Sequence, residues 1–171
     1  MRTIKHLGFA IVLAVTTLLS SCSSSDGDGG GGGSTAVGTM KAKIAGSNWT
    51  SMSMATAATH QNTVLIVQGS DATGKAIQLM IAGVTAPGTF QINDTSAIDA
   101  IASYTQANIS NPMASLVFAA PYEGSGTVGT ITVTDLSATN VKGTFSFTGK
   151  NQSGADTKQI TDGVFNVNFT N

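Results

Sequence analysis

The chain has 171 residues, of which 41% are hydrophobic, 10% charged and 6% aromatic. Its lysines and arginines are few and scattered, which excludes the clustered basic footprint of a nucleic-acid-binding protein. The sole cysteine is Cys22, so the rest of the chain can hold no disulfide, no cysteine-based zinc site and no cysteine nucleophile.

Residues 1–21 have the pattern of an export signal peptide. Arg2 and Lys5 form a positive n-region, and the apolar run of residues 7–19 is too short to span a bilayer comfortably. The run ends in Leu19-Ser20-Ser21-Cys22, which resembles the lipobox of bacterial lipoproteins. The resemblance implies cleavage between Ser21 and Cys22 and lipidation of the Cys22 thiol, so the membrane is the first expected partner. The alternative is an ordinary secretory leader with a chance cysteine.

Residues 22–36 form the predicted tether. The stretch 23–34 reads SSSDGDGGGGGS and has too little apolar surface to offset the entropy of ordering, so we expect a disordered Gly/Ser/Asp linker. Asp26 and Asp28 do not complete a calcium loop, because the remaining ligand positions are glycine and no closing glutamate follows. Small acidic residues after a lipidated cysteine also resemble the export signal of some Bacteroidetes surface lipoproteins. This resemblance implies an outer-membrane lipoprotein of the cell envelope, on the periplasmic face or the cell surface.

Residues 37–171 form the predicted domain, which we expect to be all-β: a single antiparallel β-sandwich or partly closed barrel. Short apolar segments recur between glycine, asparagine, aspartate and proline residues. Strands with one buried face are predicted where apolar and polar residues alternate, at residues 77–81, 130–134, 141–147 and 165–170. The continuous apolar run 64–67 favours a strand covered on both faces, and residues 70–75 have the chemistry of a hairpin turn.

Residues 97–109 fit both a helix and a strand. Ala100, Ala102 and Tyr104 suit a strand, and we favour a strand over 101–107 with a turn of helix before it. A phrase also repeats, as Gly88-Thr89-Phe90-Gln91-Ile92 and Gly143-Thr144-Phe145-Ser146-Phe147. It is either a duplicated hairpin or a common sequence of β-strands.

The domain also resembles a group of small uncharacterised Bacteroidetes lipoproteins. The residues that carry the resemblance are Asn48-Trp49, Gly88-Thr89-Phe90, Ala102-Ser103-Tyr104, Gly129-Thr130-Ile131-Thr132-Val133, Gly143-Thr144-Phe145-Ser146-Phe147 and Ile160-Thr161-Asp162-Gly163-Val164-Phe165. They cover nearly the whole domain, but all are structural residue types. The resemblance implies an antiparallel β fold and an envelope location, and it implies no activity.

No motif in the sequence predicts a catalytic site or a cofactor site. Residues 124–129 match GxGxxG, but a dinucleotide site needs a helix after the loop, and the strand-like TITVT follows. His60 is the only histidine outside the leader and lies in an apparent polar loop, residues 59–62, so neither a multi-histidine metal site nor a triad is favoured. The acid pairs Asp94 with Asp99, and Asp135 with Glu123, are candidates for a glycosidase dyad, although isolated acids beside small polar residues usually form turns.

Aromatic rings are the remaining candidates for ligand contact. Trp49, Tyr104 and Tyr122 can stack on a sugar or a peptide, although a lone tryptophan is more often a core or rim residue. We therefore predict a non-enzymatic binding or structural module without cofactor or metal, whose partner is a glycan, a peptide or an envelope protein. One alternative is a carrier of an apolar ligand, with an empty lumen lined by Phe145, Phe147, Phe165 and Phe169. The other is a hydrolase, which requires His60 or two acids to converge in a cleft.

Overall fold

The computed structural model describes residues 34–95 and 99–170. Eleven strands account for most of this chain, which confirms the predicted all-β class. The predictions on the leader, the lipobox, Cys22, most of the tether and the helical turn before residue 100 lie outside the described residues. Within the described ranges, no helix has the length and apolar character that crossing a bilayer requires.

The first eight strands are short, and the last three are long. Their bounds are β1 Thr39–Ile44, β2 Ser47–Thr50, β3 Thr56–Gln61, β4 Val64–Ser70, β5 Lys75–Ile81, β6 Gly88–Asn93, β7 Ala100–Gln106, β8 Leu116–Ala120, β9 Thr127–Leu136, β10 Asn140–Asn151 and β11 Thr157–Asn168. Two 3-10 turns interrupt them, η1 at Ser53–Ala55 and η2 at Pro112–Ala114.

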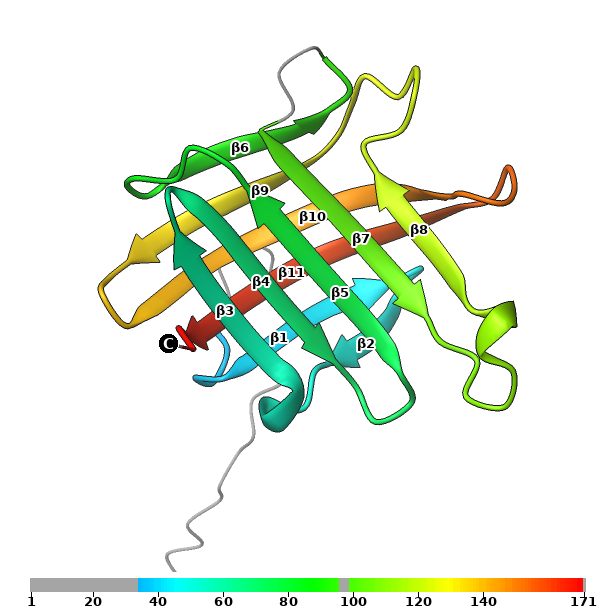
Figure 1. The fold of residues 1–171 in the computed structure, drawn as a ribbon, viewed down its shortest axis with the longest axis horizontal. Coiled ribbons are helices and arrows are strands. Elements are labelled where there is room, and N and C mark those ends of the chain that lie inside the picture. The colour runs from blue at the N-terminus through cyan, green and yellow to red at the C-terminus, as the bar shows by residue number, and fades with distance from the viewer. Residues whose placement is uncertain (1–33, 96–98, 171) are drawn as a thin grey trace, which may run out of the picture.

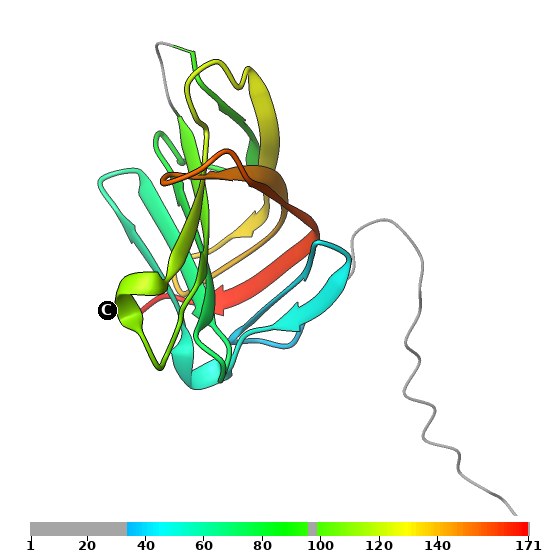
Figure 2. The same ribbon diagram turned by 90° about the vertical axis from the view of Figure 1, so that its right-hand side faces the viewer.

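One antiparallel sheet bends into two layers whose strands cross steeply (Figure 1). The front layer has the order β8-β7-β5-β4-β3, and the back layer has the order β6-β9-β10-β11-β1-β2. The layers join at one corner where Lys150 and Asn151 of β10 pair with β8. They approach again at a second corner, where Ala58 of β3 bridges Phe169. The result is a partly closed barrel, seen from the side in Figure 2, and it agrees with the predicted architecture.

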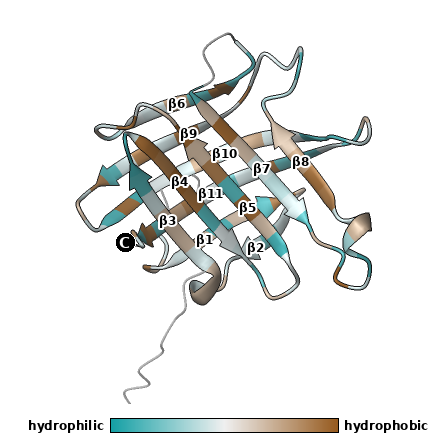
Figure 3. Ribbon diagram, viewed as in Figure 1, coloured by the Kyte–Doolittle hydropathy of each residue, from teal (hydrophilic) through white to brown (hydrophobic). Residues whose placement is uncertain are grey.

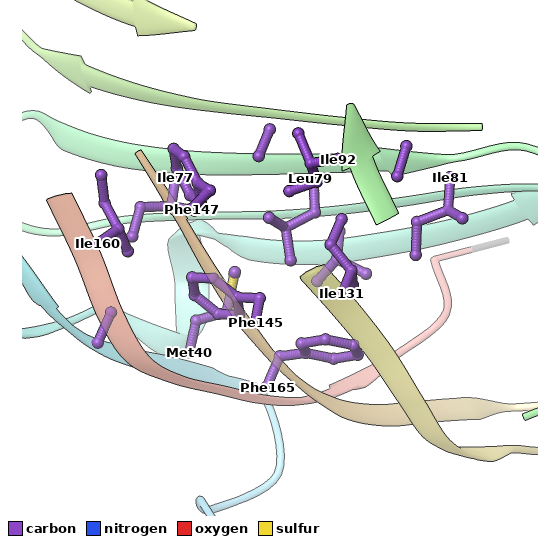
Figure 4. Close-up of a cluster of buried hydrophobic side chains, with 14 of the residues drawn as sticks. Met40, Ile77, Leu79, Ile81, Ile92, Ile131, Phe145, Phe147, Ile160 and Phe165 are labelled. Carbon is purple, nitrogen blue, oxygen red and sulfur yellow. The ribbon is translucent and has the colours of Figure 1, made fainter. Parts of the chain in front are cut away.

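The hydrophobic core lies between the two layers (Figure 4). Alternate side chains of β5 point inward, and Ile77, Leu79 and Ile81 are all buried. They face Phe145 and Phe147 of β10 and residues of β1, β9 and β11. The alternation predicted for residues 77–81, 130–134 and 141–147 is confirmed, and so is the hairpin at 70–75, which joins β4 to β5.

Each of three core phenylalanines lies opposite a glycine on the neighbouring strand. Phe145 pairs with Gly163 and Phe165 with Gly143, both between β10 and β11. Phe147 pairs with Gly129 of β9. The Phe145 ring centroid lies 6.5 Å from that of Phe147 and 6.4 Å from that of Phe165, so the three rings pack against one another. They fill the place where the carrier alternative requires an empty lumen.

The repeated glycine-threonine-phenylalanine phrase marks the two strands that flank β9. Gly88 of β6 and Gly143 of β10 both pair with Val133, and Phe90 and Phe145 both pair with Ile131. The two copies therefore share one partner strand in one register. They do not form two separate hairpins.

Three details differ from the predictions. In β4, Leu65 and Val67 are buried, but Val64 and Ile66 are only partly covered, because the outer face of the front layer is open. His60 lies in β3, not in a loop, and the turn that follows it is formed by Asn62 and Thr63 with φ of 49° and 66°. Strand β7 confirms the strand over the helix for this segment, but it begins and ends one residue earlier than the predicted 101–107, and Ala102 and Tyr104 are buried in it.

The N-terminal residues of the described chain contact the back layer. Thr35 is 7% exposed, and its carbonyl oxygen accepts a hydrogen bond of 3.0 Å from Asn166 Nδ2. Asn166 is therefore buried although it points away from the core, whereas the sequence pattern places it on an exposed face. Thr35 belongs to the stretch that the sequence analysis assigns to the tether.

Candidate functional site

The three aromatic candidates do not form one site. Trp49 is 5% exposed in the edge strand β2, opposite Ala42, and its indole Nε1 has no hydrogen-bond partner among the described residues. Tyr104 is 1% exposed inside the front layer, and its ring stacks on Phe118 with centroids 6.0 Å apart. Burial, and secondarily the Asp71 carboxylate, raise the pKa of Tyr104. Both rings belong to the core and offer no surface for stacking.

Tyr122 is the accessible member of the three. It is half-buried in the connection between β8 and β9, where Lys150 Nζ lies 5.6 Å from its ring centroid. Its backbone N–H points to Ser125 Oγ at 3.4 Å. A lysine over the ring covers one face, so Tyr122 alone offers little stacking surface.

Of the candidate catalytic residues, His60 and Asp135 contact other groups, and Glu123 lies away from Asp135. His60 Nε2 is 2.9 Å from the carbonyl oxygen of Val84, and its ring stacks on Phe169 at 5.9 Å. Asp135 forms an ion pair of 3.2 Å with Lys142, whereas Glu123 precedes the other end of β9. Asp94 and Asp99 flank residues 96–98, which the structure does not describe, and no hydrogen bond of either carboxylate is seen in the described part. No group of three or more metal-ligating His, Cys, Asp or Glu side chains forms among the described residues.

The GxGxxG match at residues 124–129 is a turn that runs into a strand. Gly124 and Gly126 have φ of 73° and 59°, and β9 begins at Thr127. The structural interpretation of this match is confirmed.

The outer face of the front layer, called the front face below, is nearly free of charge. Lys75, the first residue of β5, is the only Lys, Arg, Asp or Glu in the five strands of this layer. Polar uncharged and apolar residues are interspersed across it (Figure 3). In one row across the sheet, Gln68 of β4 pairs with Gln78 of β5, which pairs with Ser103 of β7.

This row forms part of a shallow pocket of about 300 Å³ in the front face. Small residues line the remainder, with Ala55 of η1 at one side and Ala76 and Thr105 in the neighbouring row. In the described part of the chain, the side chains of Gln68, Gln78, Ser103 and Thr105 make no hydrogen bond to protein. Amides and hydroxyls both donate and accept, so the pocket presents unpaired groups of both kinds without a net charge.

Part of this pocket can be predicted from the sequence. The hairpin turn at 70–75 sets the register of β4 against β5, and that register places Gln68 opposite Gln78. The position of Ser103 cannot be predicted in this way, because it depends on the pairing of β5 with β7, and a long connection separates these two strands.

Most of the domain matches a known protein family. A model for a domain of unknown function, DUF6252, matches residues 37–167, which is more than half of the chain. The chain belongs to the DUF6252 family. No curated protein and no solved structure matches it. The DUF6252 match includes both layers of the barrel and every residue that lines the front-face pocket.

Proposed function

We propose that this DUF6252 protein is an envelope lipoprotein whose β domain is a binding module that takes its ligand in the front-face pocket. The anchor is supported by the leader and by Leu19-Ser20-Ser21-Cys22, which resembles a lipobox. The Gly/Ser/Asp stretch after Cys22 supports a spacer between membrane and domain. An outer-membrane location is part of the proposal and rests on the same residues.

The observation that carries the binding role is the set of unpaired polar side chains in the pocket. Gln68, Gln78 and Ser103 lie side by side in register, and none is hydrogen-bonded to protein in the described part of the chain. Solvent-exposed faces of soluble domains usually carry interspersed charges, and this one does not. A neutral surface with convergent donors and acceptors favours a neutral ligand rich in hydroxyl or amide groups.

A sugar unit of a glycan fits this chemistry best. Its hydroxyls match amide and hydroxyl side chains, and a pocket of about 300 Å³ is at the lower end of the range for small ligands. No aromatic ring lines the pocket, so hydrogen bonds would carry the recognition, with modest affinity.

The two alternative functions have less support. A carrier needs an empty lumen, but Phe145, Phe147 and Phe165 pack against one another. A hydrolase needs converging groups, but His60 contacts Val84 O and Phe169, and Asp135 pairs with Lys142. The proposal therefore includes no catalytic step and no cofactor.

The test is a titration of the ¹⁵N-labelled protein with a panel of neutral oligosaccharides, followed by NMR. We expect shifts confined to residues that line the pocket, including the side-chain amides of Gln68 and Gln78. The Gln78→Ala change should weaken binding about five-fold, since one hydrogen bond contributes about 1 kcal/mol. Gln91→Ala is the matched control, because Gln91 is an exposed strand glutamine on β6. Equal effects of the two changes, or no shifts with any oligosaccharide, would contradict the proposal.

A further inference from the structure

Several large apolar side chains are exposed outside the front face. Met113 is 95% exposed, Met54 90%, Ile109 73% and Val37 58%. Met52 is also exposed, next to η1. We call these five residues the apolar rim. None of these residues belongs to the buried core. Single exposed apolar residues are common, but several that gather along one edge mark an interaction surface.

Four of the rim residues lie in or beside two segments along one edge of the molecule. Met52 and Met54 lie at η1, and Ile109 and Met113 lie in the connection between β7 and β8 (residues 107–115). The turn between β4 and β5 (residues 71–74) carries no rim residue but lies at the same edge, which is the lower edge in Figure 1 and in the lower half of Figure 2. Backbone hydrogen bonds tie them together. Met52 N donates to Ser70 O at 2.8 Å, and Ala107 N donates to Gly74 O at 3.4 Å.

Val37 joins the rim through the start of the domain. A Cβ atom on Gly38 would lie 3.8 Å from Ser53 Cβ, so the chain before β1 passes beside η1. The rim therefore includes the part of the domain that lies closest along the chain to the predicted tether.

The rim is apolar and almost uncharged. In η1, the β4–β5 turn and the β7–β8 connection, Asp71 is the only charged residue. Its carboxylate already accepts hydrogen bonds from the backbone of Thr73 and Lys75, at 2.8 and 3.0 Å. Methionine is flexible and polarisable, and it adapts to an irregular apolar environment such as the boundary between headgroups and acyl chains.

The length of chain outside the structure identifies the surface that can cover the rim. Eleven residues, 23–33, separate Cys22 from Ser34, where the described chain begins. A flexible Gly/Ser stretch of this length has a root-mean-square span of roughly 20 Å. If Cys22 carries lipid, the rim stays within reach of the bilayer that holds the anchor.

We propose that the apolar rim docks into the lipid surface to which the chain is tethered, with Met54, Ile109 and Met113 entering the headgroup–acyl boundary. The inference rests on the lipid anchor proposed above and adds an orientation to it. Ala55 lines the front-face pocket and follows Met54 directly, so docking places the pocket immediately outside the headgroups.

Methionine oxidation tests this docking inside one molecule. The mature lipidated protein is reconstituted on phosphatidylcholine vesicles and treated with hydrogen peroxide, and mass spectrometry gives the oxidation rate of each methionine. Exposure alone predicts that Met113 and Met54 oxidise fastest, then Met80, which is 38% exposed on the front face, and last the buried Met40. Docking reverses the order, because lipid covers Met54 and Met113 and leaves Met80 in water. Hydrogen peroxide is small enough to reach a methionine that is merely close to the membrane, so protection indicates insertion into the lipid.

A pair of variants provides the matched control. In the lipidated Ile109→Ser, Met113→Ser protein, the protection of Met54 should be lost several-fold. In the Met80→Ser protein it should be unchanged. Oxidation rates that follow exposure would overturn the docking while leaving the anchor intact, and they would favour a protein partner for the rim. Failure of the wild type to float with the vesicles would overturn the anchor and the docking together.

Discussion

Three glycines determine where the core phenylalanines can lie. Gly129, Gly143 and Gly163 each pair with a phenylalanine on the next strand. At Gly143 and Gly163 the ring of that phenylalanine occupies the position where a Cβ atom would stand, whereas at Gly129 the Cα and Cβ atoms of Phe147 come that close. Gly143, the glycine in the second copy of the repeated phrase, is thus a packing residue, and its backbone conformation is ordinary. Burial of the rings contributes to stability through the apolar area removed from water.

The first prediction concerns Phe145, which is 4% exposed and contacts Phe147 and Phe165. Replacing it by alanine should lower the free energy of unfolding by about 3 to 5 kcal/mol, because the lost ring leaves a cavity. Thr144→Ala, on the opposite face of β10, should cost less than about 1 kcal/mol. Urea denaturation measures both. Equal costs would show that the register of β10 is wrong.

The second prediction concerns Gly143. A Cβ atom there would overlap the carbonyl oxygen of Thr132 and the ring of Phe165, and neither can move without distorting β9 or the core. Gly143→Ala should therefore destabilise by about 2 to 3 kcal/mol. Gly154→Ala is the control, because its Cβ would meet only Asn151 Nδ2, at 3.7 Å. Thermal melting should separate the two variants, and similar melting temperatures would contradict the close approach at Gly143.

At the scale of elements, the β4–β5 hairpin is stabilised by one carboxylate. Asp71 accepts hydrogen bonds from Thr73 N and Oγ1 and from Lys75 N. Burial works to raise the pKa of Asp71, but these hydrogen bonds and the charge of Lys75 outweigh it, so its pKa lies below the usual value. The ionised form therefore favours the folded state.

The third prediction is a pH dependence. Since the pKa of Asp71 is lower in the folded chain, its contribution is complete above the unfolded-state pKa of about 3.9 and is lost as the pH falls through the folded-state pKa. Asp71→Asn should cost about 1 kcal/mol at neutral pH, and this difference should shrink below about pH 4. Asp156→Asn, at an exposed position whose side chain makes no hydrogen bond or ion pair in the described chain, should have no effect. A cost of Asp71→Asn that is independent of pH would contradict the account.

Elements with a local pattern could be predicted, and elements set by distant pairing could not. The alternation in 77–81 and the turn at 70–75 predict β5 and its hairpin because both signals lie within a few residues. The branch in which β6 pairs with β9 has no such signal, since Gly88 and Val133 are far apart in sequence. The polar residues around His60 predict a loop. In the structure His60 lies instead at the end of β3, where a strand can carry polar side chains.

The candidate site was missed for a related reason. Aromatic rings are a prominent sequence signal for ligand contact, but Trp49 and Tyr104 are core residues. The pocket residues Gln68 and Ser103 are ordinary in sequence, and only the register of three strands brings them together. The exposure of Met54 and Met113 likewise has no sequence signal, because isolated methionines in loops have no periodicity.

At the scale of the whole molecule, the core and both layers lie within residues 35–170. The fourth prediction is that a protein beginning at Ser34 folds cooperatively, with the circular dichroism of a β protein. A protein beginning at Val37 should also fold, but it should be about 1 to 2 kcal/mol less stable, because the buried Asn166 amide loses the carbonyl of Thr35. A disordered spectrum for the first protein would contradict the domain boundary.

In the proposed function, lipidated Cys22, the sole cysteine of the sequence, holds the domain at a membrane. The mature chain after it has six lysines and nine acidic residues, a net charge of −3, so electrostatic attraction to an anionic membrane does not replace the anchor.

The most direct test is acyl labelling in a bacterial host with lipoprotein-processing enzymes. The wild type should incorporate a clickable fatty acid, lose residues 1–21 and partition into detergent. Cys22→Ser should abolish labelling and cleavage before residue 22, leaving a precursor or a form released by ordinary signal peptidase. A Cys22→Ser protein that labels and partitions as well as the wild type would contradict the central claim.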